Sequence, residues 1–291
     1  MNKIMLHTDV IYNSNVLRDI TIIHMGDIHF SKVMDILKFD MIKDLVYKNN
    51  PDYIVITGDL IDTPKIVKDK GHIKKLVMFL TDLASMTKVI ISLGNHDVFM
   101  LDDYKFFRNL NDLKNIYVLN NECYIDCDIY ISGMTLPHNY YYNITKRESR
   151  ELLLEYLNKN KKLVLNLPKK LPKVGLIHSP INLCDNDVLK VLNEYDLLLS
   201  GHTHGGMVLR IFNKLFKPNQ GLIAPNKRLF PEVARGKMVK DILGKKITLI
   251  ITSGVTKLSL SSAKILNKLN FLYNIDINKI IITSKKGRYY E

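Results

Sequence analysis

Short apolar runs recur along the chain, and five of them lead directly into a polar cluster. Isoleucine, valine and leucine dominate these runs, as is typical of strands in the core of a sheet. Glycine, aspartate, asparagine or histidine follows each run, so each strand would carry such side chains to the edge of its sheet. We therefore expect the five clusters to meet at one edge of one sheet. The runs cover residues 20–23, 53–56, 89–92, 174–177 and 197–199.

Segments with helical periodicity separate most of these strands. The alternation of strands and helices predicts an α/β fold with two sheets that are flanked by helices. Two neighbouring short strands, 123–126 and 129–133, are expected to form a hairpin. The predicted helices cover residues 35–48, 72–85, 102–110, 147–160 and 187–193. The remaining predicted strands cover residues 116–119, 247–253, 272–277 and 279–284.

The composition is typical of a globular protein with a large core. The chain has 291 residues, of which 46% are hydrophobic, and its mean hydropathy is −0.03. We interpret residues 1–291 as a single domain, with motifs at 26–206, a basic loop at about 207–246 and closing strands at about 247–286. No apolar stretch approaches the ~18 to 20 residues that span a bilayer, and residues 1–19 have no continuous apolar core. We therefore expect a cytoplasmic protein, either free or peripheral at the membrane.

The chain carries a strong positive charge. Its formal net charge is +13 and its pI is about 9.4, which suits weak contact with nucleic acid or an anionic membrane. Lysine greatly outnumbers arginine, however, and an AT-rich coding sequence enriches lysine, asparagine and isoleucine. The charge therefore reflects either composition or a preference for anionic partners that centres on residues 214–246. Cys123 and Cys127 suggest a metal pair, but no second pair completes a site, and the odd cysteine count predicts no disulfide framework.

The residue types in the five clusters are those of a transition-metal site. Asp27 and His29 stand two positions apart, so an extended backbone points both side chains to the same side. Asp59 has two carboxylate oxygens that can bridge two cations, and Asn95 adds a neutral carbonyl oxygen. Imidazole nitrogens are offered by His178, His202 and His204. This mixture suits Mn, Fe, Zn, Co or Ni better than Ca, and two such ions ~3.5 to 4 Å apart would clamp both oxygens of a displacement at phosphorus.

Five segments of the chain match the motifs of a known family. They are Gly26–His29, Gly58–Asp62, Gly94–Asp97, Ile177–Pro180 and Ser200–Gly206. With them the chain resembles the calcineurin-like metallophosphoesterase superfamily. The resemblance implies a four-layer α/β/β/α sandwich with a dinuclear metal site between strand ends. It also implies a metal-dependent phosphohydrolase that acts on a phosphate ester and uses Mn, Fe, Zn, Ni or Co.

The resemblance assigns a role to each polar residue of the motifs. The first ion would be bound by Asp27, His29 and His204. The second ion would be bound by Asn95, His178 and His202, and both ions would be bridged by Asp59. His96 would face the phosphate, either stabilising transition-state charge or protonating the leaving group, and Asp97 would orient His96. A hydroxide that bridges the ions would be the nucleophile.

With two glycines after His204, the last motif resembles that of one branch of this superfamily. The members of this branch are bacterial phosphodiesterases that often act near membranes. Residues 230–232 loosely match a loop of that branch, whereas Met207 stands where many members carry glutamine. We predict a phosphodiesterase, although a phosphomonoesterase or a nuclease would use the same residues. A non-catalytic scaffold on this fold would lack ligands, and here every ligand position is filled. The tyrosines at 140–142 are expected to be partly buried loop aromatics.

Overall fold

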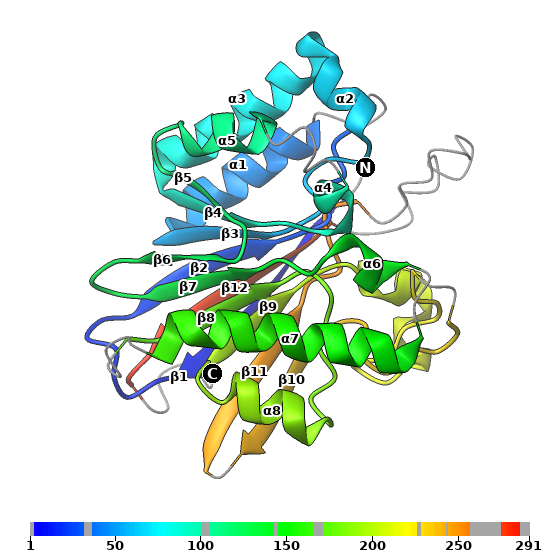
Figure 1. The fold of residues 1–291 in the computed structure, drawn as a ribbon. Helices are drawn as coiled ribbons and strands as arrows, with labels where there is room; N and C mark the ends of the chain where they lie inside the picture. Colours follow the sequence, from blue (N-terminus) through cyan, green and yellow to red (C-terminus); the bar gives the residue numbers. More distant parts are fainter. Residues whose placement is uncertain are drawn as a thin grey trace.

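Two six-stranded sheets form the centre of the protein (Figure 1). The structure is a computed structural model that describes residues 3–31, 37–99, 105–142, 145–165, 171–225, 228–242, 244–256 and 275–285. In spatial order, the first sheet contains β1 (Ile4–Tyr12), β12 (Ile275–Thr283), β2 (Ile20–Met25), β3 (Tyr53–Thr57), β4 (Lys88–Ser92) and β5 (Ile116–Leu119). The second contains β10 (Gly236–Ile242), β11 (Lys245–Ile251), β9 (Leu197–Ser200), β8 (Lys173–Ile177), β7 (Tyr130–Met134) and β6 (Glu122–Ile125).

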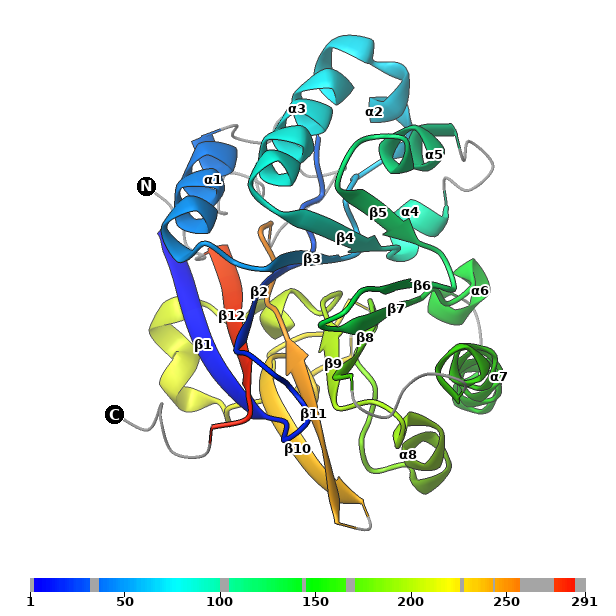
Figure 2. The ribbon, with the colours of Figure 1, turned by 90° about the vertical axis from the view of Figure 1, so that its left-hand side faces the viewer.

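Helices cover the outer face of each sheet, so the molecule has four layers (Figure 2). The first sheet is covered by α1 (Leu37–Asn49), α3 (Lys70–Met86) and α5 (Lys105–Asn111), and the second by α7 (Lys146–Leu165) and α8 (Asn186–Leu192). The short helices are α2 (Pro64–Lys68), α4 (Asn95–Val98), α6 (His138–Tyr141), η2 (His204–Met207) and η3 (Arg210–Leu215). The expected α/β/β/α sandwich is confirmed. Within the described ranges, the helices are too short or too polar to cross a bilayer.

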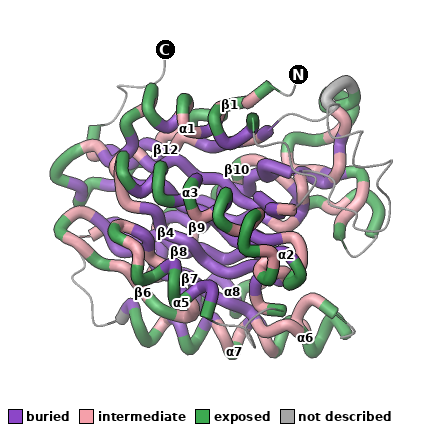
Figure 3. Tube along the Cα trace, turned by 90° about the horizontal axis from the view of Figure 1, so that it is seen from above, coloured by how far each residue is buried: buried purple, intermediate pink, exposed green. Residues whose placement is uncertain are grey.

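Side chains that alternate along each strand produce this layering. In β2, Ile22 packs into the core between the two sheets, whereas Ile23 packs into the core beneath α1 and α3. In β9, Leu197 and Leu199 face the inner core, and Leu198 faces the core beneath α7 and α8. Figure 3 shows central strands such as β4, β8 and β9 buried between helices whose outer surfaces are exposed. Each such side chain contributes about 1.5 to 3 kcal/mol through burial, so the alternating pattern strongly favours one stacking of the layers.

The C-terminal ends of the central strands meet at one end of the sandwich. The strands β2, β3 and β4 run parallel, and so do β8 and β9. Hydrogen bonds join the two sheets there, because His178 Nδ1 donates to Thr57 O (2.7 Å) and Thr256 N donates to Asp27 O (3.0 Å). The polar clusters therefore lie between the edges of two sheets, and the expectation that one sheet carries all of them was wrong.

The strand β12 is continuous, where two separate strands were expected at 272–277 and 279–284. Residues 272–274 lie outside the described residues. Asn278, at the middle of β12, pairs with His7 of β1 on one side and with His24 of β2 on the other. Pairing on both sides overrides the weak strand preference of asparagine, which is why the predicted break does not occur.

Both edge strands on this side of the sandwich escaped the sequence pattern. The strand β1 pairs in parallel with β12 alone and exposes many of its residues, so it lacks the apolar run of a central strand. The strand β10 lies within the segment 207–246 that we expected to be a loop, and it pairs antiparallel with β11. That expectation was wrong because an edge strand with an exposed face has little hydrophobic pattern.

The five predicted helices are confirmed, with shifted ends. The helix α7 continues to Leu165 instead of ending at 160, and α3 extends by a short stretch at both ends. The first residues predicted for α1 and α5, at 35–36 and 102–104, lie outside the described residues. The predicted hairpin is also confirmed, because β6 and β7 pair antiparallel.

Candidate metal centre

The seven residues expected to bind metal all lie at the joined strand ends. Asp27 and His29 follow β2, Asp59 follows β3 and Asn95 begins α4. The remaining three are His178 after β8 and His202 and His204 after β9. Possible ligand atoms lie within 4.8 Å of one another in two groups, Asp27 with His29 and His204, and Asp59 with His178 and His202.

Asp59 lies between the two groups. Its Oδ2 atom is 3.5 Å from His29 Nε2 and 3.2 Å from His178 Nε2. His178 Nε2 is also 3.1 Å from Asn95 Oδ1 and 3.1 Å from His202 Nδ1. One carboxylate therefore reaches both groups, and Asn95 completes the second of them.

Backbone carbonyls determine which imidazole nitrogen faces the cluster. A carbonyl only accepts hydrogen bonds, so the Nδ1 atom of His178 carries the proton that it donates to Thr57 O (2.7 Å). His204 Nδ1 donates to Thr256 O (2.9 Å) in the same way. The Nε2 atom of each neutral ring keeps its lone pair, which is the form that binds a metal ion.

Strained backbone is concentrated in these residues. A left-handed φ is found at Asp27 (50°), His29 (46°), Asp59 (50°), His202 (69°) and His204 (49°). Such conformations cost on the order of 1 to 3 kcal/mol each and tend to cluster at functional sites. Gly94 is required for a related reason, because a Cβ atom there would collide with Asp59 Oδ1. The fold therefore keeps strained backbone conformations at positions where they place these side chains in the cluster.

His29 provides the test of whether the residues present fit a metal ion. Its side chain is 2% exposed, and neither ring nitrogen has a hydrogen-bond partner among the described residues. Buried polar atoms without partners are costly and rare. The carboxylates of Asp27 and Asp59 face the ring without a hydrogen bond to it. A cation would satisfy all three groups, and the mixed donor set fits transition-metal ions.

Burial and neighbouring charges set the protonation of the cluster. Burial raises the pKa of the Asp27 carboxyl and lowers the pKa of the His29 and His202 rings. Burial alone would likewise raise the pKa of Asp59 and lower the pKa of His178. Their mutual contact instead brings the pKa of Asp59 well below its usual range and raises the pKa of His178 to about 9. A metal cation would displace the proton of this pair, since imidazole binds metal in its neutral form.

The structure changes the role expected for Asp97. Its buried carboxylate accepts hydrogen bonds from Leu60 N (3.1 Å) and Gly94 N (3.0 Å), and so ties the loop after β3 to the loop after β4. His96 Nδ1 donates instead to Asp62 O (2.7 Å). The expectation that Asp97 orients the His96 ring was wrong, because the Asp97 side chain is occupied by backbone N–H groups.

Asp62 is a site residue to which the sequence analysis gave no role. Its Oδ1 atom lies 3.7 Å from His29 Nδ1, and its carbonyl orients His96. An isolated parallel bridge between Phe30 and Ile61 brings the segments after β2 and β3 side by side and places Asp62 there. The available signal was its position in the matched segment Gly58–Asp62.

Two of the three neighbouring tyrosines also belong to the site. The Tyr141 ring lies 5.2 Å from the His202 ring, measured between centroids. The Tyr142 hydroxyl accepts a hydrogen bond from Asn95 Nδ2 (3.3 Å), which leaves Asn95 Oδ1 turned toward His178. Tyr141 ends the short helix α6 and Tyr142 directly follows it. The sequence pattern carried no sign of their position beside the site.

Several known proteins resemble this chain. A metallophosphoesterase of Campylobacter jejuni is 28% identical over 217 residues, covering 72% of this chain and 50% of its own length. A metallophosphoesterase of Helicobacter pylori is 26% identical and covers 68% of this chain and 48% of its own length. A Bos taurus transmembrane protein with a metallophosphoesterase domain is 27% identical, covering 66% of this chain and 42% of its own length. The chain thus spans about half the length of these relatives.

Solved structures and a family model complete the comparison. A Thermus thermophilus protein aligns with a TM-score of 0.48 at 11% identity, covering 80% of this chain and 89% of its own. A dimetal phosphatase from Danio rerio aligns with a TM-score of 0.41 at 11% identity, covering 81% of this chain and 87% of its own. The family model described as Calcineurin-like phosphoesterase matches residues 20–206, which is well over half of the chain and contains all seven clustered residues. The chain therefore belongs to the calcineurin-like phosphoesterase family.

Proposed function

We propose that this protein hydrolyses phosphate esters with two metal ions held between the ends of its two sheets. The position of Asp59 carries the proposal, because its carboxylate lies within 3.5 Å of His29 Nε2 and 3.2 Å of His178 Nε2 and so can serve two ions at once. The ligands of one ion would be Asp27, His29 and His204, and those of the other Asn95, His178 and His202. Mn, Fe, Zn, Ni or Co suits this donor set.

The metal ions, when bound, would supply positive charge to the phosphate oxygens and lower the pKa of the attacking water. The protein itself supplies orientation. Thr57 O and Thr256 O hold the Nδ1 atoms of His178 and His204, which leaves the Nε2 atom of each ring to bind an ion. Because these groups are already fixed by the fold, little reorganisation is needed when the substrate arrives.

His96 is placed to act on the substrate itself. Its ring is half-buried, lies 4.7 Å from the His29 ring between centroids, and is fixed by the bond from Nδ1 to Asp62 O. The Nε2 atom is then available to the phosphate. We assign His96 to the stabilisation of transition-state charge or to protonation of the leaving oxygen, since a positioned histidine contributes typically ~10² to 10⁴-fold in such roles.

Within this function we propose a phosphodiesterase. The support is the segment Ser200–Gly206, which resembles that of bacterial phosphodiesterases. A phosphomonoesterase or a nuclease would use the same residues, so the ester class must be measured. A non-catalytic scaffold is disfavoured, because all seven ligand positions are filled and clustered.

The test compares bis-p-nitrophenyl phosphate with p-nitrophenyl phosphate, using protein loaded with Mn²⁺ and the same protein after chelation. We expect the diester to be hydrolysed with the higher kcat/KM and the chelated protein to be inactive. A preference for the monoester would identify a phosphomonoesterase. Cleavage of DNA or RNA in preference to both small esters would identify a nuclease. Absence of turnover on every ester, with metal shown to be bound, would reject the enzyme.

A further inference from the structure

A cavity opens beside the candidate metal centre, between the edge strands of the two sheets. Its volume is about 660 Å³, and residues of β1, β10, β11 and β12 line it together with His204. The register places it at the metal end of the sandwich, because Gly236 at the start of β10 pairs with Ile251, and Ile251 pairs with Ser200 just before the Gly201–His204 turn. His204 thus belongs to both the metal centre and the cavity wall.

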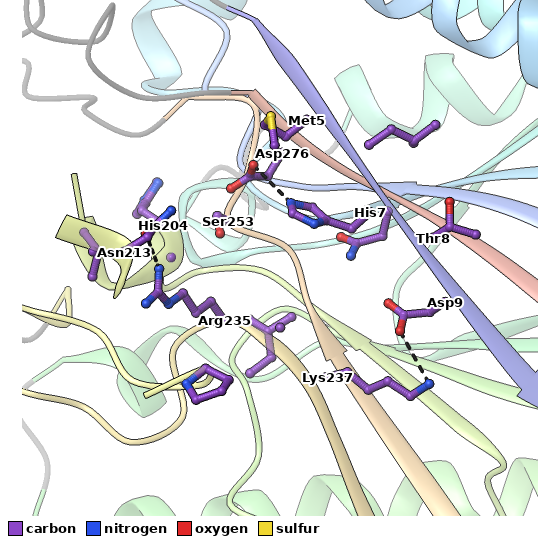
Figure 4. A pocket seen from close by; sticks show the side chains of 17 residues that line it. Met5, His7, Thr8, Asp9, His204, Asn213, Arg235, Lys237, Ser253 and Asp276 are labelled. Atoms are coloured by element: carbon purple, nitrogen blue, oxygen red, sulfur yellow. Dashed lines mark hydrogen bonds and ion pairs between the residues drawn. The ribbon is translucent and has the colours of Figure 1, made fainter. Parts of the chain in front are cut away.

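Most charged groups in the cavity are already paired. His7 Nε2 lies 3.5 Å from Asp276 Oδ1, and Lys237 Nζ lies 3.4 Å from Asp9 Oδ1. Figure 4 shows these two pairs on the walls of the cavity, while Arg235 reaches toward Asn213 and His204. These contacts engage both carboxylates of the cavity wall, Asp9 and Asp276, so Arg235 is the charged group of the wall left to meet an anion.

Arg235 differs from its neighbours because no carboxylate lies within ion-pair distance of it in the described part of the chain. Its Nη1 atom donates to the neutral amide oxygen of Asn213 (2.6 Å), and its Nε atom is buried without an acceptor. Burial lowers the pKa of Arg235, and the more distant charge of Asp276 offsets this only in part. A half-buried guanidinium with an unused donor lacks the anion that normally compensates its desolvation.

Asn278 provides a second, independent observation. Its side chain lines the same cavity and is only 4% exposed, yet its Oδ1 atom has no hydrogen-bond donor among the described residues. A buried amide oxygen without a donor is uncommon in folded proteins. The cavity therefore contains a cationic donor at Arg235 and an acceptor at Asn278 that lack partners among the residues that the structure describes. A donor and an acceptor of this kind in one cavity are typical of a binding site rather than of a packing defect.

We propose that this cavity binds a second anionic group of the substrate, a phosphate or carboxylate held by Arg235, while the ester is cleaved at the metal centre. The inference rests on the proposed function and names its substrate class. That class is phosphate esters with another anionic group, and with a hydroxyl or amine that can donate to Asn278. The fork of the Arg235 guanidinium matches the oxygens of either anion. Arg235 also belongs to the basic segment 214–246, so this part of the positive charge has a specific use.

The test measures how much a second anion adds to binding. Metal-loaded protein is titrated by calorimetry with methylphosphonate, with α,ω-alkane bisphosphonates of increasing spacer length, and with phosphonocarboxylates of matching length. The same compounds are tested as inhibitors of bis-p-nitrophenyl phosphate hydrolysis, with metal in excess to limit chelation. We expect at least one spacer to bind roughly tenfold more tightly than methylphosphonate, because its second anion would form a charge-assisted hydrogen bond with Arg235. The preferred series distinguishes phosphate from carboxylate.

Two variants and a matched control decide whether Arg235 is responsible. We expect Arg235→Gln to lose the roughly tenfold gain and Arg235→Lys to recover part of it, because lysine keeps the charge but not the fork. Arg147→Gln, at a residue with an 88% exposed side chain on α7, should keep the whole gain. Melting temperatures of the variants establish that each is folded.

Two results would overturn the inference. One is an equal affinity for mono- and bisphosphonates at every spacer length, and the other is a gain that persists in Arg235→Gln. Failure of the proposed function has a different signature, which is absence of ester turnover by metal-loaded native protein. In that case the calorimetric comparison of Arg235→Gln with Arg147→Gln still decides whether the cavity binds an anion.

Discussion

The two ends of the sandwich both carry polar clusters, but the clusters are built in opposite ways. At the end where β3 and β4 begin, the Asp126 carboxylate accepts hydrogen bonds from Tyr53 OH (2.7 Å), Lys88 Nζ (2.8 Å) and Tyr124 OH (2.8 Å). At the end where those strands terminate, the buried His29 ring has no hydrogen-bond partner among the described residues. The polar groups of the first cluster therefore have partners within the protein, whereas those of the second need a cation to complete their interactions.

Composition alone does not separate these clusters. Asp126, Cys127 and Asp128 also bring possible ligand atoms within 4.8 Å of one another. Their carboxylates already have cationic partners, since Lys88 bonds to Asp126 and Arg18 lies 2.6 Å from Asp128. Arrangement of partners, rather than the count of acids, distinguishes a cluster that stabilises the fold from one that binds metal.

The largest expected effect comes from the shared carboxylate. Asp59→Asn should remove most of the bound metal and lower turnover by more than the ~10 to 100-fold typical of losing a hydrogen-bond partner of a ligand. The amide keeps the size of the side chain but removes the negative charge that faces both groups. Metal content by mass spectrometry and diester hydrolysis measure the two losses.

Asp126→Asn is the matched change at the other end. It should keep metal and turnover while lowering the free energy of unfolding by about 1 to 3 kcal/mol, because Lys88 loses the partner of its ammonium group. Urea denaturation of the metal-free protein measures this cost. Loss of metal in Asp126→Asn, or its retention in Asp59→Asn, would remove the distinction between the two ends.

His96→Ala separates chemistry from metal binding within the metal end. We expect turnover to fall by about 10² to 10⁴-fold while metal content stays near that of the native protein. The His96 ring bonds to Asp62 O, and the contact of His96 with Asp59 is made by its backbone N–H, which alanine keeps. Parallel assays of kcat and metal stoichiometry provide the measurement. Full activity in this variant would refute its assigned role.

The two ends should also respond to acid over different pH ranges. Burial alone would raise the pKa of Asp126, but hydrogen bonds from Lys88 and Tyr53 hold it below its usual range. Because the folded pKa is depressed, this contribution to stability is complete above the unfolded value of about 3.9 and is lost only as pH falls further, through the folded pKa. Metal affinity should fall earlier, already below about pH 9, because the His178 ring, whose pKa is raised to about 9, must release its proton before it binds a metal ion.

The measurement follows from this difference. The unfolding free energies of native protein and Asp126→Asn, determined without metal, should differ by a constant amount from neutral pH down to about pH 5. Metal titrations over the same range should show a steady loss of affinity. A difference in stability that shrinks already near neutral pH would contradict the assignment of Asp126 as a fully paired carboxylate.

The smallest effect is expected at Tyr142, which supports the metal end from outside. Tyr142→Phe removes the hydroxyl that accepts from Asn95 Nδ2 at 3.3 Å. We expect metal affinity to fall by no more than about tenfold, at the low end of such effects, because the bond is long and partly exposed. Competition titrations measure this change, and Tyr117→Phe, on β5, is the control. An unchanged affinity would show that Asn95 holds its orientation without this contact.

Much of the candidate site could be predicted from the sequence, because each ligand stands next to a strand end. The apolar runs before Asp27, Asp59 and His178 mark buried strands, and polar residues directly after them must lie at a sheet edge. The helices could also be predicted from a local pattern, because the periodic apolar face of a helix is visible in the sequence within a few turns. Edge strands such as β1 and β10 were missed because partial exposure weakens that record.

The sequence by itself determined which side chains are available and at which strand ends, because periodicity and chain direction are local properties. Only the tertiary structure decided that two sheet edges share the site, that Asp62 rather than Asp97 orients His96, and that Arg235 lies beside His204 in a common cavity. The contact between His178 Nδ1 and Thr57 O, which sets the metal-facing nitrogen, joins residues 121 positions apart. Such contacts arise from the packing of layers, and no short segment of the chain encodes them.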